Sequence, residues 1–558
     1  MIRQPFFHWL WTVLTTLCKN RSSFLQACEI DFSAEKLSDG LNLVKSITRS
    51  AVQFAVTRCN CYHSDAIRSA MMKKASLALL GVLCILLGVI AFRTLSFTSR
   101  QLNSPPVQES RLDRDAILQR LSEAIRHRTI TNEATTDSGS REFQRFHNFL
   151  AKSFPRVHER LSKETIGGHS LLYSWKGKDS RLKPVLLMAH IDVVPVDPAT
   201  ESTWRHPPFS GQVANGYIWG RGTMDDKGSV MAILEAAENL LASGTEPQRT
   251  TYFAFGHDEE VGGNNGAANI AAALRSRRVE LEFVLDEGLN ILNGIISGVS
   301  SPVALIGIAE KGYLSIRLTV EGAGGHSSVP PADTAIGVMS RGLHKLLATP
   351  FSSQLNGPTR LMFEFLGPEM AWPKRLALAN LWLFDPLVRK QLASSPLTNA
   401  TIRTTLAPTI INSGVQENVL PTRAVAVLNL RILPGETIAG TIEHVRRVID
   451  DPRVQLTPLA VRIEPSSVSD IEAQSFKLLH RTIRQITPET IVAPSLLVAS
   501  TDSRHYSGLT KNIYRFLPIT LRPDDAKRFH GIDERISIED YERCVRFYGQ
   551  LIRNSQQG

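Results

Sequence analysis

The sequence predicts a layered α/β catalytic domain with a smaller α+β lid domain inserted into it. From residue 113 to residue 308, apolar runs of strand length alternate with stretches of helical spacing. Val185 to His190 is one such run, and Val230 to Leu241 has the helical pattern. This alternation is typical of a sheet covered by helices. We therefore expect residues 113–308 to form the first part of the catalytic domain.

The pattern changes at about residue 309. Residues 309–466 carry alternating strands, such as Leu314 to Val320 and Ala424 to Ile432, together with helical stretches such as Ala335 to Leu347. This is the composition of a small α+β unit, which we interpret as a lid or dimerisation domain. Residues 467–558 return to the first pattern and are expected to complete the catalytic domain.

Residues 1–112 precede the enzyme. Residues 75–93 are uncharged up to Phe92 and just long enough to cross a bilayer, and they follow Lys73 and Lys74. Positive charge before the span favours a cytosolic tail over residues 1–74, a signal anchor, a stalk over 94–112, and a lumenal or extracellular enzyme. A cleaved signal peptide, which would make the protein secreted, is the alternative.

The charge of the chain argues against one class of partner, nucleic acid, and its cysteine content leaves the cellular compartment open. The net charge of +10 is spread along the chain without a run of lysine or arginine, so we expect no binding to nucleic acid. Five of the six cysteines precede residue 90 and leave only Cys544 in the enzyme. No disulfide can form within that part, and the cysteines therefore do not decide the compartment.

Metal-type ligands follow several of the predicted strands and loops. The carboxyl ends of strands in an α/β sheet converge on one crevice, so these side chains are expected to meet there. Histidine and carboxylate ligands suit zinc, and their number favours a pair of ions. The candidates are His190, Asp192, Asp225, Glu259, Glu260, Asp286 and His530.

These residues stand in motifs that resemble the di-zinc amidohydrolase family of carboxypeptidase S, aminoacylase-1 and glutamate carboxypeptidase. Within it, the nearest likeness is to the animal N-fatty-acyl-amino-acid synthase/hydrolases. The likeness begins near Asp113, continues to the C-terminus and implies a zinc-dependent exopeptidase-like catalytic domain. The matching segments begin at Gly220 (Gly-Arg-Gly-Thr-Met-Asp-Asp-Lys), Gly256 (Gly-His-Asp-Glu-Glu), Gly325 (Gly-His-Ser-Ser-Val-Pro-Pro), Thr501 (Thr-Asp-Ser-Arg) and His530 (His-Gly-Ile-Asp-Glu).

The resemblance implies two Zn²⁺ per chain. By it, His190 and Asp286 hold one ion, Glu260 and His530 hold the other, and Asp225 bridges the two. Glu259 is then the general base, and Asp192 holds His190 in the correct tautomer.

The resemblance also implies substrate contacts from the lid. His326 is expected to stabilise the oxyanion, Asn418 to contact the substrate, and Arg431 to hold a substrate carboxylate. Arg504 is a further substrate-binding candidate. A homodimer is compatible with this family.

Several alternatives stay open. The substrate is a peptide or an N-acyl amino acid, and condensation of a fatty acid with an amino acid is the alternative direction. A non-catalytic membrane receptor on the same fold is a rival, although all five metal positions and Glu259 carry competent side chains. Residues 350–405 form an apolar insertion in the lid, which lines either an acyl or side-chain pocket or the core.

Overall fold

The computed structural model describes residues 65–107, 111–131 and 136–556, and the chain divides into two compact units. One unit joins the N-terminal part up to Thr98 with the segment Trp372–Lys390, and the other holds Ser99–Ala371 and Gln391–Gly558. The centre of the predicted lid insertion thus belongs with the N-terminal helix. The expected cytosolic tail falls mostly on residues 1–64, which lie outside the described residues.

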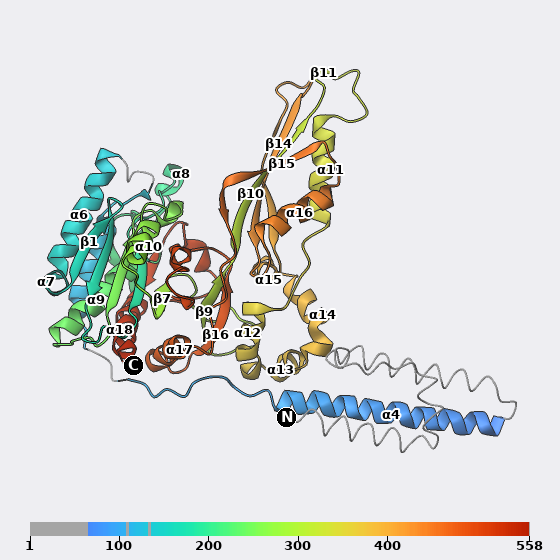
Figure 1. Ribbon diagram of the computed structural model, residues 1–558, viewed down its shortest axis with the longest axis horizontal. Coiled ribbons are helices and arrows are strands. Elements are labelled where there is room, and N and C mark those ends of the chain that lie inside the picture. Colours follow the sequence, from blue (N-terminus) through green and yellow to red (C-terminus); the bar gives the residue numbers. More distant parts are fainter. Residues whose placement is uncertain (1–64, 108–110, 132–135, 557–558) are drawn as a thin grey trace. The chain divides into compact units, whose positions relative to one another are not determined.

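The described residues of the first unit form the helices α4 (Asp65–Leu95), α13 (Trp372–Ala379) and α14 (Leu381–Leu392) (Figure 1). The part of α4 from Met72 to Leu95 is long and apolar enough to cross a membrane, and the most apolar stretch of this segment is not buried against the protein. The C-terminal end of α4 contacts α13. Positions of α14 are half-buried or exposed, and none of its residues is buried.

The catalytic part of the second unit is a mixed sheet of ten strands. Its central strand β3 is buried along its whole length, as expected of a strand that helices cover on both faces. Strands β6, β3, β7 and β17 run parallel to one another. The sheet order is β1 (Ser162–Ile166), β2 (Ser170–Trp175), β6 (Thr251–Gly256), β3 (Val185–His190), β7 (Phe283–Asp286), β17 (Ile513–Arg515), β9 (Val303–Glu310), β8 (Ile291–Leu292) and β18 (Thr520–Leu521), and β16 (Ile491–Leu497) pairs with β9.

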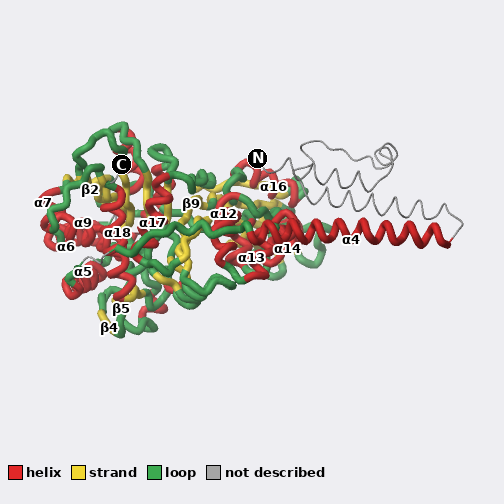
Figure 2. The backbone as a smooth tube through the Cα atoms, turned by 90° about the horizontal axis from the view of Figure 1, so that it is seen from below, coloured by secondary structure: helices red, strands yellow, loops and turns green. Residues whose placement is uncertain are grey.

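Helices pack against this sheet. Helix α9 (Lys227–Ala242) contacts β3, and α18 (Ile538–Ser555) lies beside α9 (Figure 2). Helix α10 (Ala267–Ser276) packs through Ile270 and Leu274 into a core cluster with β2, β3 and β6. The remaining α-helices of this part, among the described residues, are α5 (Arg114–Arg126), α6 (Asp137–Ser153), α7 (Pro155–Arg160), α8 (Pro198–Glu201) and α17 (Gln474–Ile486).

The lid has a separate antiparallel sheet in the order β12 (Thr405–Ser413), β14 (Arg423–Ile432), β10 (Gly312–Glu321) and β15 (Val454–Ile463). Helices α11 (Ala335–Ala348) and α16 (Ile438–Ile449) share one apolar core with this sheet. The short pair β11 (Gly325–His326) and β13 (Val419–Leu420) lies beyond the ends of β10 and β14 (Figure 1). These elements confirm the predicted α/β fold with a smaller lid.

The chain changes from one sheet to the other at a single residue, Lys311, between β9 and β10. Further helices of the lid region are α12 (Gly357–Leu366) and α15 (Pro396–Ile402). The segment from Ser99 onward, expected to be a stalk, is held by the catalytic part. The Gln101 side chain exchanges hydrogen bonds with both backbone groups of Val492, and the Leu102 N–H donates to His480.

Candidate metal centre

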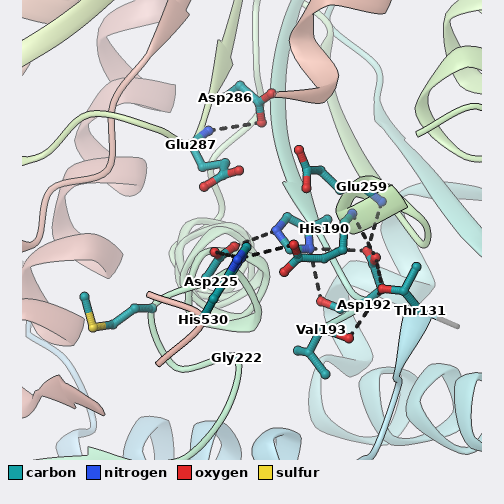
Figure 3. A network of polar contacts seen from close by, with 12 residues as sticks. Thr131, His190, Asp192, Val193, Gly222, Asp225, Glu259, Asp286, Glu287 and His530 are labelled. Atoms are coloured by element: carbon teal, nitrogen blue, oxygen red, sulfur yellow. Dashed lines mark hydrogen bonds and ion pairs between the residues drawn. The ribbon is translucent and has the colours of Figure 1, made fainter. Parts of the chain in front are cut away.

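Four of the expected ligands meet at the carboxyl end of the central sheet. His190 is the last residue of β3, and its Nε2 lies 2.9 Å from Oδ1 of Asp225. The Nε2 atom of His530 lies 3.1 Å from Oδ2 of Asp225 and 3.1 Å from Oε2 of Glu260. Two histidines thus converge on one carboxylate, as Figure 3 shows. This is the arrangement expected of a ligand that two sites share.

Asp192 is the residue that orients this group. It is fully buried, and its Oδ1 lies 3.2 Å from Nδ1 of His190. The backbone N–H groups of Glu259 and Glu260 donate to its two carboxylate oxygens, each at 3.3 Å. The Thr131 hydroxyl adds a donor at 2.6 Å. Asp192 therefore positions both the histidine ring and the turn that carries the two glutamates.

The electrostatics of the cluster fit a cation. Burial raises the pKa of Glu259 well above its usual range, and the nearby Asp502 and Glu260 charges add to that rise, while His190 opposes it. Hydrogen bonds with Asp225 and Glu260 raise the pKa of His530 to about 10. The Oε1 atom of Glu260 is buried without a hydrogen-bond partner. Such a site takes up protons when no metal is bound, and metal ions displace them.

The end of β7 carries two candidate ligands. The Asp286 carboxylate accepts the Ser503 N–H at 2.9 Å and the Glu287 N–H at 3.0 Å. Glu287 lies within ligand distance of His190 and Glu259 (Figure 3). The sequence analysis did not single out Glu287, which joins Asp286 as a candidate, and the role of Asp286 as a ligand stays a prediction.

Glu534 is a second residue that the sequence pattern missed. Its buried carboxylate accepts the backbone N–H groups of Gly222 and Met224, each at 2.9 Å, and pairs with Nη1 of Arg221 at 2.6 Å. The other terminal nitrogen of Arg221 donates to the His530 carbonyl. This buried pair ties the loop of Asp225 to the loop of His530. The signal for it was present, since Glu534 ends the His530-Gly-Ile-Asp-Glu motif.

Arg504 has a local role in the structure. Its guanidinium donates to the backbone carbonyls of Thr501 and Gly262, so it joins the β16 side of the site to the turn after Glu259 and Glu260. Gly263 in this turn has φ +64°, and a Cβ there would collide with Asp502. Substrate binding by Arg504 stays a prediction.

The lid residues form two groups. His326 pairs with Val419 between β11 and β13, and the Asn418 carbonyl accepts the Ser327 N–H, so His326 and Asn418 lie side by side. The His326 ring is exposed and accepts the Ser328 N–H at 3.1 Å. Among the described residues, the structure does not bond His326 to the metal ligands.

Arg431 lies apart from that pair, on β14. Its guanidinium carbon lies 4.8 Å from the centre of the Tyr313 ring, and burial lowers its pKa. No acidic partner for it occurs among the described residues. An arginine of this kind is able to accept an anion from outside the protein.

Comparison with known proteins agrees with this centre. Residues 186–554 match the model of peptidase family M20/M25/M40. The chain belongs to this family. It is 46% identical over 488 residues to the probable carboxypeptidase S-like 2 of Dictyostelium discoideum, with 86% of this chain and 93% of the relative covered. It is 41% identical over 455 residues to the human N-fatty-acyl-amino acid synthase/hydrolase, with 81% and 90% covered.

Solved structures share the fold. An M20 family metallo-carboxypeptidase from Sulfolobus solfataricus matches with a TM-score of 0.58 at 18% identity, covering 79% of this chain and 99% of that chain. Human carnosine dipeptidase 1 matches with a TM-score of 0.57 at 15% identity, covering 80% and 97%. The family membership confirms the resemblance found in the sequence and makes the protein a metal-dependent hydrolase.

Proposed function

We propose that the protein is a di-zinc enzyme that cleaves the amide bond next to an amino acid with a free carboxylate. The observation that carries this proposal is the convergence of His190 and His530 on the single carboxylate Asp225, with Glu260 in contact with His530. Asp225 would be shared by both ions, with His190 and either Asp286 or Glu287 on one and His530 and Glu260 on the other. Bound zinc ions polarise the scissile carbonyl and lower the pKa of water.

Glu259 is the proposed general base. Its backbone is fixed by Asp192, and its carboxylate lies with the ligand side chains of His190 and Glu287. A raised proton affinity suits a group that must take a proton from the attacking water and then deliver it to the leaving amine. The bound cations would counter part of that rise, so Glu259 would act as a base near neutral pH.

Substrate recognition is assigned to the lid. Arg431 is a half-buried cation on a strand and would hold the substrate carboxylate. His326 and Asn418 would contact the scissile carbonyl and the substrate backbone. The relatives are named for carboxypeptidase activity and for N-fatty-acyl amino acids. Both classes carry a free carboxylate next to an amide, which is the feature that Arg431 reads.

The direction of reaction is a second part of the proposal. A catalyst accelerates hydrolysis and condensation alike, so a chain that cleaves N-fatty-acyl amino acids also forms them where fatty acid and amino acid are concentrated. A non-catalytic receptor is disfavoured by the complete set of ligands and the adjacent base. We further propose that α4 anchors the enzyme in a membrane, with Lys73 and Lys74 on the cytosolic side.

The test is a competition assay on zinc-loaded protein. Short peptides and N-fatty-acyl amino acids are offered together, and the released amino acids and fatty acids are measured. Cleavage of either class, abolished in Glu259→Gln, supports the proposal, and the product ratio identifies the substrate class. Failure of the zinc-loaded parent enzyme to cleave any substrate with a free carboxylate would refute it.

A further inference from the structure

The helix pair α13–α14, two consecutive helices joined by Asn380, shows an apolar surface that the described protein does not cover. Helix α14 contains Leu381, Trp382, Leu383, Phe384 and Leu387, yet none of its residues is buried. The Leu387 side chain is 61% exposed, and Trp372 at the start of α13 is 65% exposed. Apolar helices usually gain their stability by burying such a face. The described residues of its own unit therefore leave this apolar face of the helix pair uncovered.

Hydrogen bonds join the helix pair to the C-terminal end of α4. Asn380, which joins α13 to α14, is fully buried, and its side-chain amide donates to the Thr94 hydroxyl at 3.1 Å and to the Ile90 carbonyl at 3.3 Å. The Arg93 guanidinium donates to the Ala379 carbonyl at 3.3 Å. The buried amide makes the junction specific, because an unpaired polar group there would be costly.

The position of this junction along α4 corresponds to the membrane surface. An α-helix rises ~1.5 Å per residue and the hydrocarbon core is ~30 Å thick, so about 20 residues cross it. Counted from Ala75, the first residue after the two lysines, the crossing ends near Thr94. Ile90 then lies ~6 Å below that end. The contacts of Asn380 with Ile90 and Thr94 thus place the helix pair at the boundary between headgroups and acyl chains.

The amino-acid composition of the helix pair suits the boundary between headgroups and acyl chains. Tryptophan is enriched at membrane interfaces, and Trp372 and Trp382 stand at the starts of the two helices. Basic residues accompany the apolar ones: Arg375 donates to the Phe97 carbonyl, just past the end of α4, and Arg389 pairs with Asp385 one turn earlier on α14. Helices with this mixture lie in the interface plane with their apolar side in the lipid.

We infer that the helix pair α13–α14 lies at the membrane surface and inserts its exposed apolar side chains into the lipid leaflet from which α4 emerges. The inference rests on the proposed role of α4 as a spanning helix. It makes the lid insertion a second point of membrane contact, held to the first by Asn380.

The test uses the full-length protein in phosphatidylcholine nanodiscs that contain a lipid with a photoreactive acyl chain. After irradiation, lipid-modified peptides are mapped by mass spectrometry. Peptides from α4 and from 372–390 should both be labelled, whereas the α11 peptide with Leu347, which is 60% exposed, should not. Labelling of α4 without 372–390 would overturn the inference and leave the anchor intact. Absence of label on α4 would overturn the anchor and the inference with it.

Matched variants sharpen the result. Leu387→Glu should reduce labelling of 372–390 severalfold without changing that of α4, and Leu347→Glu, an exposed leucine on another helix, should change neither. Trp372→Gln serves as the second variant if Leu387→Glu lowers the unfolding temperature. Unchanged labelling of 372–390 in both Leu387→Glu and Trp372→Gln would show that lipid does not contact this face and would refute the inference.

Discussion

His530 Nε2 lies 3.1 Å from Oδ2 of Asp225, and this pair joins the C-terminal part of the catalytic domain to the loop before α9. The loops of both residues are held together independently by Arg221 and Glu534. Contacts within the protein itself therefore hold the two sides of the centre together. Each neighbouring side chain can be tested by a single substitution.

Glu259→Gln should retain bound zinc and lose activity by about 10² to 10⁴-fold, which is the usual contribution of a general base. The amide keeps the size of the side chain but takes no proton. Metal content by mass spectrometry and turnover of the best substrate check this. Glu260→Ala is the control, since it should lose metal as well. Substantial activity in Glu259→Gln would transfer the base role to another residue.

Glu287→Gln should lower the zinc content, whereas Asp286→Asn should leave it nearly unchanged. The reason is that Glu287 lies with His190, while the Asp286 oxygens accept the Ser503 and Glu287 N–H groups. An asparagine retains one carbonyl oxygen for those donors. Zinc per chain after dialysis against a weak chelator gives the measurement. A lower zinc content in Asp286→Asn than in Glu287→Gln would identify Asp286 as the ligand.

Arg431→Ala should lower kcat/KM for a substrate with a free carboxylate by about 10 to 150-fold, because hydrogen bonds to charged groups contribute about 1.5–3 kcal/mol. Amidated analogues should be poor substrates of both proteins. Arg423→Ala, on the same strand, is the control. Equal cleavage of free and amidated substrates by the parent enzyme would remove Arg431 from carboxylate recognition.

The orientation of the enzyme follows from Lys73 and Lys74, which precede the apolar part of α4. In sealed microsomes, the catalytic part should resist protease until detergent is added. Extraction with alkaline carbonate should leave the chain in the membrane pellet. Digestion without detergent would reverse the orientation, and release by carbonate would indicate a cleaved signal peptide.

Stability should fall as the pH drops below about 6.5, in part through His480. Burial, together with a smaller contribution from the Arg484 charge, lowers the pKa of this histidine to about 3. Between pH 3 and 6.5 the unfolded chain binds a proton at this position and the folded chain does not, so stability declines by about 1.4 kcal/mol per pH unit.

Urea unfolding at pH 7.5, 6 and 5 tests this effect. The His480→Gln variant does not titrate at this position, and its amide can still accept the Leu102 N–H. Its stability should therefore depend less steeply on pH than that of the parent. Parallel pH dependences of the two proteins would assign the acid sensitivity to other groups.

The α/β class, the smaller lid and the grouping of most candidate ligands could be predicted from the amino-acid sequence. Buried strands such as β3 are continuous apolar runs, and parallel strands bring their carboxyl ends to one edge. His190, Asp225, Glu260 and His530 could therefore be assigned to one centre before any coordinates. The family motifs added the distinction between Glu259 as a base and Glu260 as a ligand, which no local pattern contains.

Contacts between distant segments could be found only in the folded chain. The Ser503 N–H donates to the Asp286 carboxylate, and Arg221 and Glu534 meet across two loops. The α13–α14 segment joins α4 through Asn380. Each of these contacts links residues far apart in the chain. Periodicity describes neighbours along a strand or helix, and it carries no information on partners that folding brings from another segment.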